Sequence, residues 1–207
     1  YDIDNSLKFE TDNSEQIFTS NAASGNRKTW TFSAWVKRAT LVDGRLTSCY
    51  TAQNETDNID ILFYSNAIKI VGWNTSYRTT NRLFRDTSAW YHIVVAVDTT
   101  QGTANDRIKI YVNGVQETSF ADTNNPSQNT DIGYNQAATT RIGSASNAAG
   151  GYFDGLMSHV HFSDGYALAP TVFGSTDSTT GEWKINTSPS FTLGTNGFTI
   201  LKDGNTI

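Results

Sequence analysis

The strongest constraint on the fold is a repeated alternation of apolar and polar residues with a period of two. In "KTWTFSAWVKR", residues 28–38, every second residue is apolar: Trp30, Phe32, Ala34 and Val36. In "WYHIVVAVD", residues 90–98, both alternating sets are largely apolar. Alternation predicts a half-buried strand, and an extended run that is apolar on both sides predicts a central strand covered on both faces.

Tight turns join further alternating runs. Asn113-Gly114 follows "RIKIYV", whose isoleucines and valine are expected to point inward, and this dipeptide is typical of a type I′ hairpin. A second hairpin is predicted in "IDILFYSNAIKIVGW", with its turn around residues 65–67. Two shorter runs complete the list. In "GLMSHVHFSDG" we expect Leu156, Ser158, Val160 and Phe162 to share a face, and in "YALAPTVFG" one helical turn before Pro170.

These strands predict an all-β fold, a two-sheet antiparallel jelly-roll sandwich. No segment sustains a period of 3.6 residues, and charged residues make up only 17% of the chain. Many short strands separated by Gly and Asn turns are typical of sandwiches and jelly rolls. Residues 72–86 and 121–150 are expected to be long loops, which in compact domains tend to be functional or mobile.

Composition excludes several classes of function. Asp and Glu number 20 against 15 Lys and Arg, and no basic run occurs, which argues against a nucleic-acid partner. No apolar stretch is long enough to span a bilayer. The single cysteine, Cys49, cannot form an internal disulfide, so the fold depends on packing. The chain begins at Tyr1 without a secretory leader, and we expect it to be a piece of a longer protein.

Five segments together carry a resemblance to a known family. "SLKFE", "WTFSAWVKR", "WYHIVVAVDTT", "RIKIYVNGVQ" and "FDGLMSHVHFSDGYALAPTVFG" follow one another as in laminin-G-like domains of the concanavalin A-like lectin/glucanase superfamily. The sequences of these segments are especially similar to versions of the domain in structural proteins of marine bacteriophages. The resemblance gives a laminin-G-like jelly-roll domain over residues 1–175. Residues 176–207 form a C-terminal extension that packs on the domain or leads to a further region.

The family implies a role in recognition. Its members include non-enzymatic modules that bind glycans or proteins, sometimes with calcium at the rim. We therefore expect a virion structural or recognition module: a capsid decoration, fibre or tail component of a bacteriophage, assembled in the host cytoplasm. Its expected partners are other virion proteins, host-surface polysaccharide and further copies of itself, with exposed Trp35 or Tyr111 available to a neighbour. The alternatives are a purely structural virion subunit and a glycoside hydrolase.

Glycan-binding candidates come from aromatic residues beside amides, because sugars present apolar CH faces next to hydroxyls. The first cluster is Trp73, Asn74, Tyr77 and Arg78, and the second is Tyr134 with Asn135 and Gln136. The alternative is a purely structural role, in which Trp73 packs on the sheet edge.

Calcium takes oxygen ligands from loops without a fixed motif. Weak candidates stand at the ends of predicted strands: Asp98, Asp106, Asp154 and Asp164. Aspartate at a strand end is also an ordinary turn former, which is the favoured interpretation.

The sequence offers no convincing set of catalytic residues. Glu55 and Asp57 would share a face of an extended strand, but Asp60 would point the other way, so a solvated loop is favoured over a glycosidase dyad. His159 and His161 alternate onto one face without a third ligand, which favours two outward polar residues over a metal site. Cys49 lacks a histidine nearby in the sequence, so a bystander thiol is expected. The sequence predicts no enzyme and no obligatory cofactor.

Overall fold

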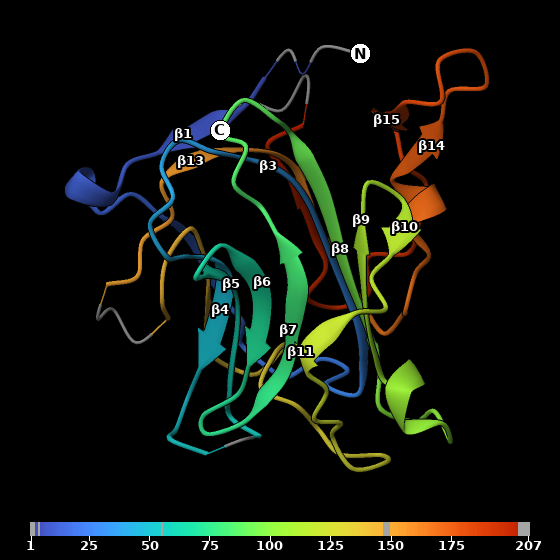
Figure 1. Cartoon of the computed structure of the whole chain (residues 1–207). Helices are drawn as coiled ribbons and strands as arrows, with labels where there is room; N and C mark the ends of the chain where they lie inside the picture. Colours follow the sequence, from blue (N-terminus) through green and yellow to red (C-terminus); the bar gives the residue numbers. More distant parts are fainter. Residues whose placement is uncertain (1–2, 4, 55, 147–149, 203–207) are drawn as a thin grey trace.

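The chain folds into two antiparallel sheets packed face to face, as the computed structural model shows (Figure 1). The structure describes residues 3, 5–54, 56–146 and 150–202. The predicted all-β sandwich is confirmed. Its only helical elements among these residues are three single 3₁₀ turns, η1 (Thr11–Asn13), η2 (Ala104–Asp106) and η3 (Pro170–Val172). In the described part of the chain, no helix is long and apolar enough to cross a membrane.

The first sheet, called sheet A, has β3 and β8 at its centre. In spatial order it contains β1 (Leu7–Phe9), β13 (Gly155–Asp164), β3 (Thr29–Arg38), β8 (Tyr91–Asp98), β9 (Ile108–Val112) and β10 (Val115–Gln116). The short β16 (Phe198–Ile200) pairs with β13 beyond the point where β1 ends. Both ends of the chain therefore cover the same edge of β13.

The second sheet, called sheet B, contains the strands whose connecting loops form the candidate site described below. In spatial order it contains β11 (Phe120–Asp122), β7 (Ser76–Leu83), β6 (Ala67–Val71), β5 (Asn58–Tyr64), β4 (Gly44–Tyr50), β12 (Thr139–Ile142) and β2 (Ile17–Ser20). A separate small ribbon pairs β14 (Gly174–Thr176) with β15 (Trp183–Ile185).

The prediction of uninterrupted loops at residues 72–86 and 121–150 was wrong. The first range contains β7, and the second contains β12 and the end of β11. β7 and β12 lack apolar alternation because polar residues occupy buried positions: Arg78 and Thr80 in β7, and Thr140 in β12. The remaining stretches of both ranges do form loops, and these loops build the site described below.

The core lies between the two sheets and follows the predicted alternation. Trp30, Phe32, Ala34 and Val36 of β3 are fully buried, as are Ile59, Ile61 and Phe63 of β5. Burying one large apolar side chain contributes roughly 1.5–3 kcal/mol relative to leaving it exposed, so the facing rows are the main stabilising feature. Every residue of β8 from Tyr91 to Val97 is buried, which confirms that this strand is covered on both faces.

Both predicted hairpin turns are present. Asn113 and Gly114 have φ of 49° and 78°, and Ser65 and Asn66 have φ of 49° and 69°. Positive φ at both central residues is the signature of the type I′ turn, whose twist matches the flanking strands. After Gly114 the returning strand is short, only Val115–Gln116.

A bulge in β13 overturns the predicted face for that strand. The register with β3 shifts between Ser158 and His161, where His159 takes a φ of 47°. An extra residue reverses the alternation. Leu156 and Ser158 therefore pair opposite outward residues, whereas Phe162 faces the core opposite Phe32. The short helix is also displaced, because it begins at Pro170 rather than preceding it.

The outer face of sheet A is covered by residues 165–202, called here the C-terminal segment. Trp183 of this segment donates an indole N–H to Nδ1 of His92 at 3.0 Å. Phe173 and Phe191 contact the ring of His161, with centroids 5.3 and 5.7 Å away. The two histidines are consequently buried. The same cover leaves Trp35 only 8% exposed, so the expectation that Trp35 is free for a neighbour was wrong.

Burial fixes the protonation of these histidines. Desolvation, with a smaller contribution from the other histidines, lowers the pKa of His92 to about 3. Desolvation also lowers the pKa of His161 to about 3. His92 lies between the indoles of Trp35 and Trp183, with ring centroids 5.1 and 5.9 Å away, and its Nε2 is 2.9 Å from Ser33 Oγ. A neutral His92 can accept from Trp183 and donate to Ser33 at once. His159 and His161 were predicted to be half-exposed, and that prediction was wrong, because both are buried.

Candidate functional site

A pocket of about 390 Å³, called the rim pocket, opens where three loops meet at one end of sheet B. The loops connect β4 to β5, β6 to β7, and β11 to β12 (Figure 1). Because β4–β5 and β6–β7 are neighbouring antiparallel hairpins, their turns emerge at the same end of the sheet. The pocket is lined by Thr56, Asn74, Thr75, Tyr77, Asn124, Asn125, Pro126, Ser127 and Thr130.

A buried arginine holds one wall of the rim pocket. The guanidinium of Arg78 donates to the carbonyl oxygens of Tyr77 and Asn124, at 2.7 and 3.0 Å, and to Oδ1 of Asn125 at 2.5 Å. Its carbon Cζ lies 5.6 Å from the ring centre of Phe120. Burial lowers the pKa of this guanidinium. Three acceptors on one rigid, planar donor group fix the backbone of residues 124–125 in place.

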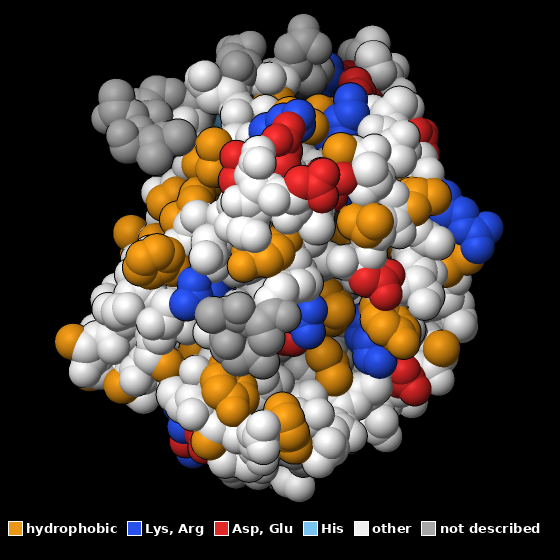
Figure 2. All heavy atoms as spheres, turned by 90° about the vertical axis from the view of Figure 1, so that its left-hand side faces the viewer, with side chains coloured by type: hydrophobic (Ala, Val, Ile, Leu, Met, Phe, Trp, Pro, Cys, Tyr) orange, Lys and Arg blue, Asp and Glu red, His pale blue; other side chains and the backbone are white. Residues whose placement is uncertain are grey.

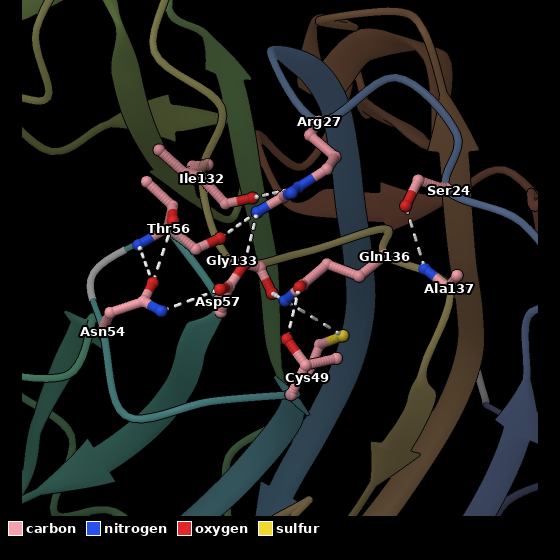
Figure 3. A network of polar contacts seen from close by, with 11 residues as sticks. Ser24, Arg27, Cys49, Asn54, Thr56, Asp57, Ile132, Gly133, Gln136 and Ala137 are labelled. Carbon is pink, nitrogen blue, oxygen red and sulfur yellow. Dashed lines mark hydrogen bonds and ion pairs between the residues drawn. The ribbon is translucent and has the colours of Figure 1, made fainter.

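A second arginine, Arg27, anchors the pocket residue Thr56, and Figure 3 shows its contacts. Arg27 donates to the carbonyl oxygens of Thr56 and Ile132, and its guanidinium pairs with the carboxylate of Asp57 at 3.2 Å. Asn54 closes the turn by accepting hydrogen bonds from the backbone N–H and the hydroxyl of Thr56. The β4–β5 loop is thus tied to the β11–β12 loop, and the pocket is preformed.

Several polar groups of the rim pocket are left for a ligand. The side chains of Asn74 and Ser127 have no hydrogen-bond partner among the described residues, and Asn74 is exposed. Asn124 uses its Nδ2 on the carbonyl of Ser76, which leaves its Oδ1 unengaged within the same part of the chain. Free amides and hydroxyls both donate and accept, so the pocket suits a ligand rich in hydroxyl groups.

The structure brings part of the first predicted cluster together. Trp73 is 38% exposed and adjoins Asn74 in the β6–β7 loop, while Tyr77 lines the pocket at 4% exposure. Arg78 lies beneath the pocket, where it supports the wall rather than facing solvent. The pocket residues that sequence reasoning missed include Asn124, Asn125, Ser127 and Thr130. They belong to the stretch "NNPSQNT", whose amide-rich composition was a visible signal.

The second predicted cluster lies in the interior. Tyr134 is 1% exposed, with its ring 4.9 Å from that of Trp30 and its hydroxyl 2.6 Å from Thr47 Oγ1. Burial raises the pKa of this phenol far above its usual range. Asn135 is fully buried and donates to Oδ1 of Asp164 at 2.7 Å. Both side chains are committed to packing and internal hydrogen bonds.

The four calcium candidates do not form one cluster. Asp98 and Asp106 border a common cavity, but Asp98 accepts hydrogen bonds from Thr100 and Gln101, and Asp106 pairs with Lys109 at 3.1 Å. These hydrogen bonds lower the pKa of Asp98 against the opposing effect of desolvation.

The other two aspartates also have protein partners. Asp154 accepts a hydrogen bond from the hydroxyl of Thr40 at 2.6 Å. Asp164 accepts the backbone N–H groups of Asn26 and Asn196 besides the amide of Asn135. Within the described ranges, no three His, Cys, Asp or Glu side chains are grouped closely enough to hold a metal ion.

The catalytic candidates are engaged elsewhere. Glu55 lies outside the described residues. Asp57 pairs with Arg27, and Asp60 accepts from Arg45 at 2.8 Å and from Ser48 at 2.6 Å. Cys49 is a buried free thiol whose pKa is raised, mainly by burial. A thiol in such surroundings is a poor nucleophile.

The surface charge is mixed. In Figure 2, Lys and Arg side chains lie among Asp and Glu on a face dominated by uncharged polar side chains and backbone. No continuous basic area appears on that face, in keeping with the net charge of −5. Phosphate-rich polymers need clustered cations, which this face does not offer.

Comparison with solved structures finds the same fold in proteins of low sequence identity. A heptameric SAP-like pentraxin from Limulus polyphemus aligns with a TM-score of 0.56 at 17% identity, over 82% of this chain and 80% of its own. A candidate carbohydrate-binding protein from Bacteroides ovatus aligns with a TM-score of 0.50 at 16% identity, over 97% of this chain and 60% of its own. Tailspike protein 2 of an Escherichia coli bacteriophage aligns with a TM-score of 0.53 at 10% identity, over 81% of this chain and 23% of its own.

The sequence comparisons find a matching family but no matching curated protein. No curated protein matches the chain. The family model of the laminin G type, described as the concanavalin A-like lectin/glucanases superfamily, matches residues 11–173, which is more than half of the chain. The match coincides with the two-sheet sandwich seen here and confirms the family resemblance read from the strands. This chain belongs to the concanavalin A-like lectin/glucanase superfamily.

Proposed function

We propose that this chain is a non-enzymatic recognition module that binds glycans through the rim pocket. The observation that carries the proposal is a preformed pocket of about 390 Å³ whose lining includes the unengaged amide of Asn74 and hydroxyl of Ser127. The exposed Trp73 directly precedes Asn74 in the same loop. Sugars are recognised by hydrogen bonds to their hydroxyls and by aromatic contact with their CH faces. Two internally bonded arginines hold the loops, so little ordering is required on binding.

The biological setting we propose is the surface of a bacteriophage particle, with host-surface polysaccharide as ligand and other virion proteins as partners. A tailspike protein among the structures of the same fold supports this setting, and the lectins named in the family's description support a glycan ligand. Calcium is not required in the proposal, because the acidic side chains near the loops are already paired within the protein.

Glycan-array binding followed by titration calorimetry tests the proposal. We expect Trp73→Ala and Asn74→Ala each to weaken binding at least about fivefold, since losing one aromatic contact or hydrogen bond costs about 1 kcal/mol. Tyr166→Ala, which removes an exposed aromatic side chain elsewhere, serves as the matched control and should bind normally. Equal binding by all three variants, or no binding of any glycan by the parent chain, would contradict the proposal.

A purely structural virion subunit is the second candidate, favoured by the free edge of sheet B. There β2 ends the sheet, and Phe18 is 62% exposed beside a groove of about 420 Å³ between β2 and β16. If Trp73→Ala blocks incorporation into particles and the parent chain binds no glycan, this second function replaces the first. Release of reducing sugar by the parent chain would instead indicate a glycoside hydrolase.

A further inference from the structure

A second pocket, of about 250 Å³, lies on the opposite side of the sandwich between sheet A and the C-terminal segment. We call it the tryptophan pocket, because three of its walls are indoles. Its lining consists of Ile3, Trp35, Trp90, Asn113, Glu182, Trp183, Lys184 and Ile185. Three tryptophans around one cavity are unusual for a chain that contains five.

The position of Trp183 in this pocket is fixed by its surroundings. Its Nε1 is bound to His92, and its ring lies against two glycines. A Cβ at Gly114 would come within 2.3 Å of the ring, and one at Gly174 within 2.7 Å. The Asn113-Gly114 turn therefore serves two purposes, because it closes the hairpin and leaves space for the indole.

The pocket also carries polar groups that the protein leaves unengaged. Trp35 is more than nine-tenths buried, and its Nε1 has no hydrogen-bond acceptor. An unpaired buried donor costs about 1–3 kcal/mol, and this N–H is closed off from solvent. Asn113 uses its Oδ1 on the backbone N–H of His92, while its Nδ2 has no partner among the described residues.

Charge in the pocket is nearly balanced. Lys184 pairs with Asp177 at 2.7 Å, whereas the carboxylate of Glu182 accepts no hydrogen bond from the described part of the chain. The pocket thus offers indole rings, one amide donor and one carboxylate acceptor.

We propose that the tryptophan pocket binds a single sugar ring, independently of the rim pocket. Indole faces suit the CH face of a pyranose, and hydroxyls can satisfy Nδ2 of Asn113 and the carboxylate of Glu182 at the same time. The volume lies below the roughly 300–1,000 Å³ of pockets for larger ligands, which limits the occupant to one ring.

The donor chemistry separates a sugar from the other ligand that an aromatic cage can take. A quaternary ammonium group binds aromatic faces by cation–π attraction, but it carries no acceptor for the amide of Asn113. A sugar hydroxyl supplies that acceptor and also a donor for Glu182. Trp183 and Glu182 lie outside the residues matched by the family, so this pocket depends on the part of the chain beyond the shared domain.

Nuclear magnetic resonance of the five indole N–H groups tests the proposal. The whole chain is titrated with the methyl glycosides of glucose, galactose and N-acetylglucosamine, and separately with choline chloride. We expect at least one glycoside to shift the Trp35 and Trp90 signals saturably, with a Kd between about 1 mM and tens of millimolar. Glu182→Gln should weaken binding severalfold while keeping the dispersion of a folded spectrum, and Trp90→Ala should abolish it.

Other outcomes overturn the proposal or separate it from the rim site. Absence of saturable shifts with every glycoside, or shifts of the same signals by choline alone, overturns it. Unchanged affinity in Glu182→Gln and Trp90→Ala also overturns it, because the binding then lies elsewhere. Trp73→Ala, altered at the rim, should keep the Trp35 and Trp90 shifts, so the failure of one site is distinguishable from the failure of the other.

Discussion

Acid should destabilise this fold through the two histidines enclosed by the C-terminal segment. Folding holds the pKa of His92 and of His161 at about 3, whereas an unfolded histidine has a pKa of 6.5. Between these values the unfolded chain binds more protons than the folded one, so stability falls as pH decreases. The contribution of neutral, buried histidines is complete above pH 6.5 and is lost progressively below it.

The size of the effect follows from the same values. At pH 5 an unfolded histidine lies about 1.5 pH units below its pKa, and one unit corresponds to about 1.4 kcal/mol, so each residue costs about 2 kcal/mol. The two together cost about 4 kcal/mol relative to pH 7.5. Carboxylates with lowered pKa values, such as Asp98 and Asp177, titrate below this window and do not interfere.

Urea unfolding followed by tryptophan fluorescence measures this loss. With a slope of about 2 kcal/mol/M, the midpoint should fall by about 2 M urea between pH 7.5 and pH 5. His92→Gln is the matched variant, since its amide can accept from Trp183 and donate to Ser33 but does not titrate. That variant should show about half the pH dependence. A urea midpoint that does not change with pH would refute the reasoning. A midpoint that changes with pH as much in His92→Gln as in the parent chain would also refute it.

Three further predictions concern the backbone, the rim and the thiol. Gly114→Ala should destabilise by at least about 1–2 kcal/mol, because its φ is 78° and the new Cβ meets Trp183, whereas Gly102→Ala, with open space around it, should be near neutral in thermal unfolding. Arg78→Ala should cost about 2–4 kcal/mol in urea unfolding and weaken glycan binding, since it leaves buried carbonyl oxygens unpaired; unchanged stability would contradict its supporting role. Cys49 should react with a thiol reagent only at the rate of unfolding, and fast labelling of the native protein would show that it is not enclosed.

Core strands such as β3 were predictable because their alternation shows the buried face in the sequence. Trp30 and Phe32 alternate with polar residues, and the Asn113-Gly114 pair identifies the turn. In contrast, β7 was not predictable, since its inward side includes Arg78, whose guanidinium donates to the carbonyl of Tyr77 and to Asn124 and Asn125 of a distant loop. Apolar alternation indicates a strand that is buried against apolar neighbours. It does not indicate a strand whose buried side chains are held by polar hydrogen bonds.

The site was predictable only in part for a related reason. Trp73 and Asn74 come from one short loop, so composition alone pointed to them. The other wall of the rim pocket comes from Asn124 and Ser127, some fifty residues later, and the pairing of the two loops depends on sheet order. Residues 176–207 were expected to pack on the domain or lead to a further region, but their little apolar alternation did not indicate that Trp183 covers sheet A.

A crystal structure of the chain soaked with the oligosaccharide that it binds best on the array is the most direct measurement. The account predicts a sugar ring in the rim pocket, with hydroxyls hydrogen-bonded to Asn74 and Asn124 and the loop carrying Trp73 in contact with it. Bound sugar located only on the outer surface of sheet B, or an empty rim pocket at saturating ligand, would contradict it.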